Sequence, residues 1–140
     1  MDKLKIKIDA FHLLQAARLL LDDYSLWTQE LYAKDLAGRS MRPYDPNVVC
    51  WCSVGALRAF DKLQEEAVAH QHLADAMVDG STDESVTSFN DKDNTHMHHQ
   101  LVLQRFDKAI LSLGKEIART TRDLPGARNR LTYKTAKAGC

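Results

Sequence analysis

Residue types that can perform thiol chemistry occur at three separate places in this chain. Cys52 lies in an apolar segment, Asn90 lies in a polar stretch, and His98 and His99 follow it. A cysteine activated by an imidazole that an asparagine orients is the set used by thiol hydrolases. One hypothesis is therefore a small hydrolase with Cys52 as nucleophile, His98 or His99 as base and Asn90 as the orienting residue.

A buried, inert thiol is the interpretation that we favour for Cys52. Free cysteine is among the residue types most often found buried, and the stretch from Cys50 to Ala56 is apolar and rich in small residues. If a helix begins at Asp45, Cys52 lies about two turns into it, where the helix dipole lowers a thiol pKa little. Gly55 in the interior of that helix indicates close approach of another backbone.

Histidines and cysteines also raise the question of a metal site. His96 and His99 are three residues apart, and Cys50, Cys52 or Asp91 would complete the three or four ligands that zinc needs. The spacing matches no standard zinc signature, because the sequence contains neither Cys-x-x-Cys nor His-Glu-x-x-His. We therefore expect histidines at a solvated helix start, and we predict neither a metal nor a cofactor.

Asn90 and Asp91 allow a structural and a ligand-binding interpretation. Such side chains commonly bond to backbone N–H groups in loops or cap a nearby helix, which is the interpretation we favour. In the alternative, Asn90, Asp91 and Trp51 contact a ligand in a cleft. Trp27, Trp51 and Tyr32 would then line an apolar pocket, although large aromatic residues in a chain of this size usually belong to the core.

Apolar spacing predicts the first two helices that would position these residues. An apolar stripe at three- and four-residue spacing over residues 10–24 indicates an amphipathic helix capped by Asp9. Residues 3–8 alternate with period two, which fits a half-buried strand as well as a frayed start of that helix. Asp45-Pro46 predicts the start of a central helix, apolar nearly all round, that runs to Leu63.

The remaining pattern completes a mainly α fold. The segment 64–78 predicts a helix, or a continuation of the central one, ending at Asp79-Gly80, and residues 79–95 read as a loop. The last helix should start near Asn94 or Thr95 and end near Arg119. Turn residues within 30–42 predict a short hairpin. We expect a compact bundle of three to five helices around the central apolar helix, with a minor β-hairpin.

Length, charge and cysteine content restrict the class of protein. The 140 residues suit one domain, which we place at 1–119, with a basic and mobile tail at 120–140. Nineteen basic and nineteen acidic residues cancel, so no global field attracts nucleic acid or a membrane. The chain has neither a signal-peptide core nor an apolar run of the roughly 18 residues that span a membrane, so we expect a cytoplasmic protein. Three cysteines do not form a disulfide framework.

The tail is a weak signal for nucleic acid. The tail contains five basic residues and one acidic residue, Asp123. No aromatic residues alternate with the basic ones, as they do in many nucleic-acid-binding segments. A solvated terminus is the default expectation, unless Leu131 and Tyr133 hold the tail as an edge strand. The five cations are Arg122, Arg128, Arg130, Lys134 and Lys137.

Several short motifs together resemble a family of small bacterial and phage domains, known as a domain of unknown function. The resemblance covers roughly residues 10–118 and implies a shared fold, but no activity. Cys50, the cluster His96-Met97-His98-His99 and the basic tail lie outside the family's pattern. The motifs are Asp45-Pro46, Trp51-Cys52, Gly55-Ala56-Leu57 and Phe89-Asn90-Asp91, followed by a closing helix.

The sequence favours a non-enzymatic binding or regulatory module that acts through a protein surface. This expectation rests on the absence of catalytic signatures from the sequence, and the resemblance adds a phage or mobile-element origin. The alternatives are the Cys52 hydrolase and an accessory protein that binds metal or nucleic acid. The expected partner is a protein and not a membrane, and the sequence does not indicate the oligomeric state.

Overall fold

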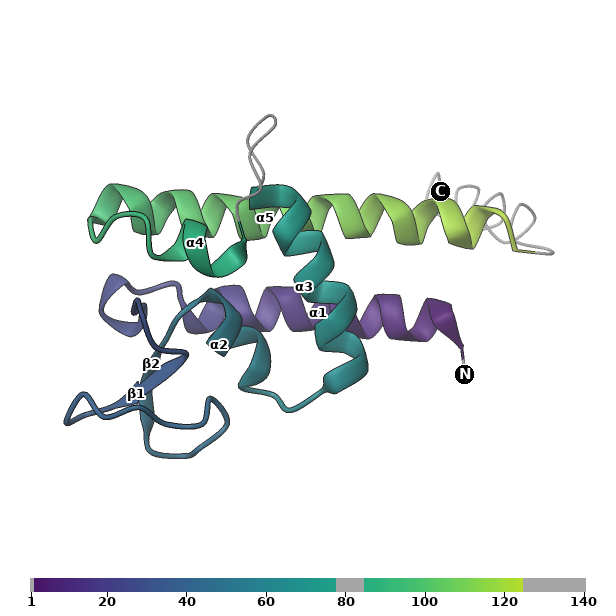
Figure 1. Ribbon diagram of the computed structural model, residues 1–140. Coiled ribbons are helices and arrows are strands. Elements are labelled where there is room, and N and C mark those ends of the chain that lie inside the picture. The colour runs from purple at the N-terminus through teal and green to yellow at the C-terminus, as the bar shows by residue number, and fades with distance from the viewer. Residues whose placement is uncertain (1, 78–84, 125–140) are drawn as a thin grey trace, which may run out of the picture.

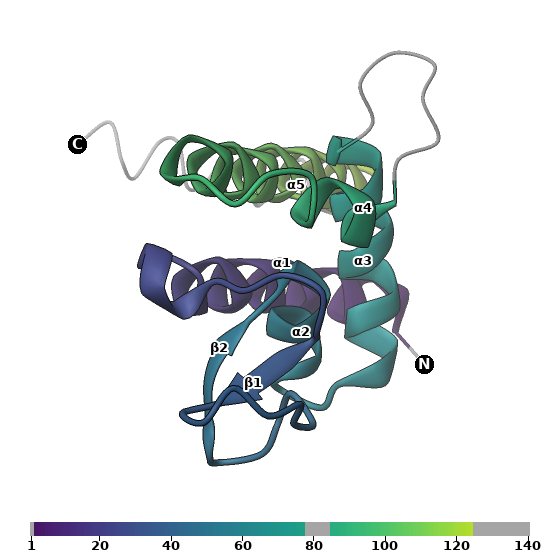
Figure 2. The same cartoon turned by 60° about the vertical axis from the view of Figure 1, so that its left-hand side comes forward.

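Three long helices form the body of the protein. In the computed structural model, which describes residues 2–77 and 85–124, α1 (Lys3–Leu20) and α5 (His96–Arg122) run antiparallel. The third helix, α3 (Leu63–Met77), crosses both of them (Figure 1; Figure 2). The other elements are η1 (Tyr24–Leu26), β1 (Ala33–Asp35), β2 (Val48–Trp51), α2 (Ser53–Arg58) and α4 (Val86–Asn90). The expected helical bundle with a minor hairpin is confirmed.

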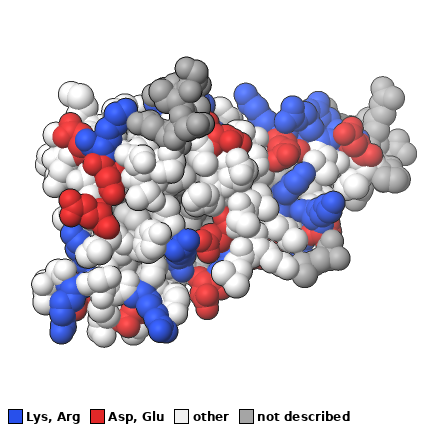
Figure 3. Space-filling view, viewed as in Figure 1, with Lys and Arg blue, Asp and Glu red and all other residues white. Residues whose placement is uncertain are grey.

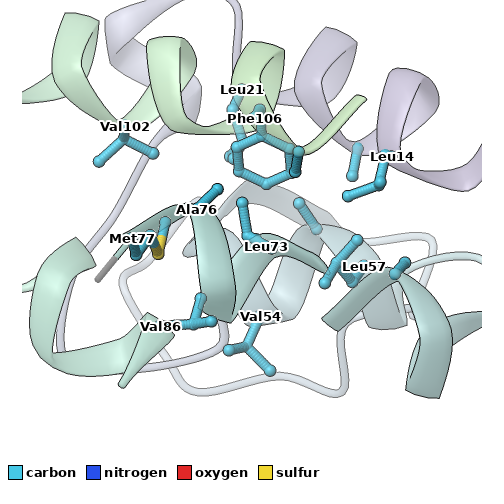
Figure 4. Packing of buried hydrophobic residues seen from close by; sticks show 14 of the residues in the cluster. Leu14, Leu21, Val54, Leu57, Leu73, Ala76, Met77, Val86, Val102 and Phe106 are labelled. Carbon is cyan, nitrogen blue, oxygen red and sulfur yellow. The ribbon is translucent and has the colours of Figure 1, made fainter. Parts of the chain in front are cut away.

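The apolar core lies where α1, α3 and α5 meet. Figure 4 shows Phe106 of α5 next to Leu73 of α3, and Leu14 of α1 belongs to the same cluster. All three side chains are fully buried, and burial of one such side chain stabilises the fold by about 1.5–3 kcal/mol. The short helix α2 adds Val54 and Leu57 to the same cluster. The core therefore connects α2 directly to the three long helices.

The first helix begins earlier than its apolar stripe indicated. Asp2 caps α1, and its carboxylate accepts a hydrogen bond from the backbone N–H of Leu4 at 3.0 Å. Residues 3–8 are therefore helical, and of the two interpretations of this segment the helix is correct. Asp9 does not cap the helix as predicted. It lies inside α1 and pairs with Lys5, one turn earlier, at 3.2 Å.

Of the predicted central helix from Asp45 to Leu63, only residues 53–58 are helical, and Leu63 begins the separate helix α3. Residues 48–51 form the strand β2, since Val48, Val49 and Trp51 are types that fit a pleated surface. Asp45 stabilises a turn instead of a helix, because its carboxylate accepts the N–H of Asn47 at 2.8 Å. The helix α2 starts only after Cys52 and has six residues.

The hairpin is present, but its second strand comes later in the chain than expected. β1 pairs antiparallel with β2, so that Ala33 lies opposite Trp51. The turn after β1 is as predicted: Gly38 adopts a φ of 81°, and the Asp35 carboxylate accepts the backbone N–H of Arg39 at 2.8 Å. Residues 39–41 also lie along β1, where Ser40 pairs with Lys34 in a single antiparallel β-bridge.

The stretch predicted as a loop at 79–95 contains a helix. Ser85 caps α4, and Val86 and Phe89 are buried because α4 packs on α2 and α3. The last helix starts at His96, as predicted, and continues to Arg122. The predicted helix end at Asp79-Gly80 and residues 125–140 of the tail lie outside the described residues. Within the described part, no helix is long and apolar enough to cross a membrane.

Close backbone contact explains the glycine at position 55. A Cβ atom at Gly55 would lie 1.7 Å from the carbonyl oxygen of Tyr32, which is well inside any permitted contact. The same carbonyl accepts the N–H of Cys52 at 3.1 Å. The segment before β1 thus lies directly against α2, as the glycine indicated.

Replacement of Gly55 by alanine should destabilise the protein by about 3 kcal/mol or more, because the added methyl group overlaps backbone atoms that have no space to move. Urea denaturation measures this loss. Gly114→Ala is the matched control, since its Cβ would meet only the ring of Phe11 at 3.3 Å. We expect a change within about 1 kcal/mol there. A small change in both variants would contradict the proposed contact.

Candidate functional site

Asn90 is the centre of a buried hydrogen-bond network. Its Oδ1 accepts three hydrogen bonds: from the indole Nε1 of Trp27 at 2.8 Å, from the backbone N–H of Ser53 at 2.9 Å and from the Ser53 hydroxyl at 2.7 Å. Its Nδ2 donates to the carbonyl oxygen of Thr28 and to Asp91 Oδ1, both at 2.9 Å. The Asn90 side chain thereby joins the end of α4 to the start of α2 and to the segment after η1.

Asp91 and Gln29 extend this network to the surface. Asp91 Oδ1 accepts the backbone N–H of Glu30 at 3.1 Å, and Glu30 has a φ of 72°, a left-handed conformation that is uncommon outside glycine. The Gln29 side chain donates to the carbonyl oxygens of Asn90 at 3.0 Å and Asp93 at 2.7 Å. These bonds hold residues 28–30 in the conformation that brings the chain to β1.

Cys52 is a capping residue of α2. Its side chain is 3% exposed, and Sγ accepts the backbone N–H of Gly55 at 3.3 Å. Burial raises the pKa of the thiol above its ordinary value of 9.0, and the negative charge of Asp91 raises it further, against the lowering effect of the Gly55 N–H. The reason given from sequence, that the thiol lies deep in a helix, was wrong: it lies at the helix start, and desolvation dominates.

The two predicted base residues donate to main-chain carbonyls. His98 Nε2 lies 2.5 Å from the carbonyl oxygen of Phe89, and His99 Nε2 lies 2.6 Å from that of Leu21. Since a carbonyl only accepts, Nε2 carries the hydrogen in both rings. Among the described residues no hydrogen bond joins Cys52 to an imidazole, and Asn90 bonds to Ser53 rather than to either histidine.

The residues considered for a metal site do not converge on one point, although His96 and His99 both lie on α5. His96 stacks on the exposed side of Tyr24, with 3.8 Å between the ring centroids, and His99 points into the core. Cys50 lies on β2 and is half-buried. Within residues 2–77 and 85–124, no three His, Cys, Asp or Glu side chains are grouped so that they could hold a metal ion.

The aromatic residues considered for a pocket belong to the core and its edge. Trp27 is buried and its indole contacts Asn90, while Trp51 is half-buried and donates its Nε1–H to the carbonyl oxygen of Pro43 at 2.9 Å. Tyr32 is 45% exposed and carries the guanidinium of Arg58 4.7 Å above its ring. Of the three positions proposed for ligand contact, Asn90 and Asp91 thus adjoin each other in the network, and Trp51 bonds elsewhere.

Sequence reasoning missed Ser53 and Gln29 as members of the network. A signal for Ser53 was present, because a hydroxyl inside an apolar run needs a buried partner. Gln29 gave no such signal, since a glutamine between two predicted elements normally faces solvent.

An apolar groove lies on the surface where α1 and α5 meet. It has a volume of about 390 Å³, with Phe11 of α1 on one side and Ile110, Leu111, Gly114 and Ala118 of α5 on the other. Leu111 is 60% exposed. The absence of a side chain at Gly114 gives Phe11 room to lie against α5. This groove is separate from the Asn90 network.

A family model for a family of unknown function, DUF6197, matches residues 8–111, so the chain belongs to this family. The match covers most of the region for which the sequence showed a resemblance to a domain of unknown function. No curated protein and no solved structure matches the chain significantly.

Replacement of Asn90 by alanine should destabilise the protein by roughly 3 kcal/mol or more, because three buried donors lose their acceptor and each orphaned group costs about 1–3 kcal/mol. Chemical denaturation followed by tryptophan fluorescence measures the loss. Asn94→Ala is the control, since Asn94 is exposed and accepts only the Tyr24 hydroxyl. A loss below 1 kcal/mol for Asn90→Ala would contradict the structural role.

The Cys52 thiol should resist alkylation in the folded protein. In a Cys140→Ala background at pH 7, we expect iodoacetamide to modify Cys52 about a hundredfold more slowly than in urea, because the thiol is buried and its raised pKa keeps it protonated. Cys50, which is half-buried, serves as the internal comparison. Mass spectrometry of the two peptides gives both rates. Rapid labelling of Cys52 that is lost in a His98→Ala or His99→Ala variant would support the hydrolase instead.

Proposed function

We propose that this member of the DUF6197 family is a non-enzymatic module that binds another protein through the groove between α1 and α5. The observation that carries the proposal is the exposed apolar lining of that groove, in which Leu111 is 60% exposed. Contiguous apolar surface on a small protein marks an interaction site more often than scattered single residues do.

The state of the polar residues supports binding over catalysis. The Oδ1 atom of Asn90 accepts from Trp27 and Ser53, and the ring Nε2 atoms of His98 and His99 donate to backbone carbonyls. A nucleophile needs a nearby base and a lowered pKa, whereas burial raises the pKa of Cys52. The Asn90 network therefore stabilises the fold, and the groove offers an apolar surface to a partner.

The shape of the groove suits a helix as the bound element. Four lining residues of α5 have the spacing i, i+3, i+4 and i+7, which is that of a hole that receives one side chain of a partner helix in coiled-coil packing. They are Asp107, Ile110, Leu111 and Gly114. Phe11 of α1 lies against the Gly114 corner of this hole, so a bound helix would meet Phe11 together with Ile110 and Leu111. Leu111 and Gly114 are shared with a second hole, completed by Lys115 and Ala118.

A photo-reactive benzoylphenylalanine at position 111 should cross-link to one discrete partner in the cells that normally produce the protein. The expected result is a single adduct on a denaturing gel, whose second component mass spectrometry identifies. The same probe at position 97 is the control, because Met97 is 77% exposed on the same helix but does not line the groove. The absence of any adduct at position 111, or equal adducts at both positions, would contradict the proposal.

A further inference from the structure

The groove has an electrostatic character that its apolar lining does not reveal. Lys115 lines the groove. Three more basic residues of α5 lie on the same helix face as Lys115: Lys108 is seven residues before it, Arg119 is four residues after it, and Arg122 is three residues after Arg119. All four are exposed. In Figure 3, several Lys and Arg side chains lie over the C-terminal half of α5, with Asp and Glu side chains between them. These four residues are called the basic rim below.

In the described part of the chain, Asp107, Glu116 and the C-cap residue Asp123 form no ion pair with the basic rim. Asp107 binds Arg18 of α1, with Oδ1 2.6 Å from Nε and Oδ2 3.3 Å from Nη2. Glu116 lies 3.7 Å from Lys7 of α1 and 3.0 Å from His72 of α3. The carboxylates are thus directed toward neighbouring helices. Among the described residues the basic rim has no ion-pair partner, so it leaves positive charge along one edge of an apolar groove.

Two occupants from this protein itself are disfavoured by the same charge. Residues 125–140 follow α5 and contain four basic residues and no acidic side chain. A second copy that placed its own α5 in the groove would bring its own basic rim against the first. In both cases like charges would meet at short range, which opposes association. An occupant from another protein avoids this repulsion.

We propose that the groove binds an amphipathic helix whose apolar side chains fill the holes around Leu111 and whose acidic residues, along one edge, pair with the basic rim. This inference rests on the proposed protein-binding function and adds the chemistry of the partner. Residues 107–118 extend over about three turns, so a helix of three to four turns covers the groove.

A helical partner accounts for both features of the surface, whereas nucleic acid accounts for one. Phosphate groups would bind to the basic rim but would leave Phe11, Ile110 and Leu111 exposed to water. An acidic amphipathic helix covers the apolar lining and neutralises the rim together, in the helix-in-groove mode of peptide recognition. The apolar contact supplies affinity, and the charges select the partner and its orientation.

Selection from a displayed library of amphipathic helical peptides tests this inference. The library keeps Leu or Phe on one face and randomises the flanking positions, and the full-length protein is the target. We expect the recovered peptides to carry Asp or Glu along one edge. By fluorescence anisotropy, Leu111→Asp should weaken the binding of a recovered peptide at least about tenfold. The double variant Lys115→Glu/Arg119→Glu should weaken the binding of this peptide similarly. The same double variant should bind a peptide in which Lys replaces each flanking acid more tightly than it binds the original peptide.

Lys62→Glu is the matched charge control, because Lys62 is exposed, precedes α3 and lies outside the groove. It should leave binding within about twofold of the unaltered protein. Recovered peptides without an acidic edge, or binding unaffected by the Leu111 and Lys115/Arg119 variants, would overturn the inference. So would displacement of the peptide by a 20-base-pair DNA duplex at similar concentration, or concentration-dependent dimers in sedimentation velocity that Leu111→Asp abolishes.

The proposed function and this inference fail in different ways. If the probe at position 111 cross-links one partner whose contacting helix is not acidic, the groove is a protein-binding site and only the charge argument is wrong. If position 111 gives no adduct and no library peptide depends on Leu111, both are wrong.

Discussion

The structure depends on one buried carboxamide. Asn90 Oδ1 accepts from the Trp27 indole and from both donors of Ser53, and Nδ2 donates to the main chain at Thr28. In an apolar interior each of these groups would cost about 1–3 kcal/mol if it were left unpaired, so the network forms as a unit or not at all. Because its members belong to α2, α4 and the segment after η1, it determines how these short elements attach to the three long helices.

The contact between Tyr32 and Gly55 is a second constraint of the same kind. The Tyr32 carbonyl approaches Gly55 where any side chain would collide, and it accepts the N–H of Cys52. Through one hydrogen bond and one steric contact, the short helix α2 is fixed at its N-cap and in its first turn. A six-residue helix has little stability of its own, since helix nucleation is unfavourable. Tertiary contacts therefore decide where α2 begins.

This explains which parts of the fold the sequence predicts. The helices with long apolar stripes, α1, α3 and α5, follow from periodicity, because their stripes are long enough to dominate other signals. The segment 45–58 misleads, since Asp45-Pro46 can begin a turn as readily as a helix, and Val48–Trp51 is equally apolar in either structure. Its conformation depends on pairing with Ala33–Asp35, a contact that local spacing does not contain.

The sequence likewise identified some residues of the candidate site but not all of their hydrogen-bond partners. The resemblance singled out Cys52, Gly55, Asn90 and Asp91, and in the structure Cys52 bonds to Gly55 and Asn90 bonds to Asp91. The favoured interpretation of Asn90, a bond to a backbone N–H group, is seen at Ser53, whereas the Ser53 hydroxyl and the Trp27 indole were not anticipated as partners.

The surface between α1 and α5 could not be foreseen from either helix alone. The exposed side of α5 reads as an ordinary solvated face with scattered cations, and Phe11 reads as part of the core stripe of α1. Only antiparallel pairing, with Arg18 at Asp107 and Lys7 near Glu116, brings Phe11 beside Gly114 and directs both carboxylates away from the basic rim. Because both acids pair with α1 and not with the basic rim, the packing of α1 on α5 leaves positive charge along the groove.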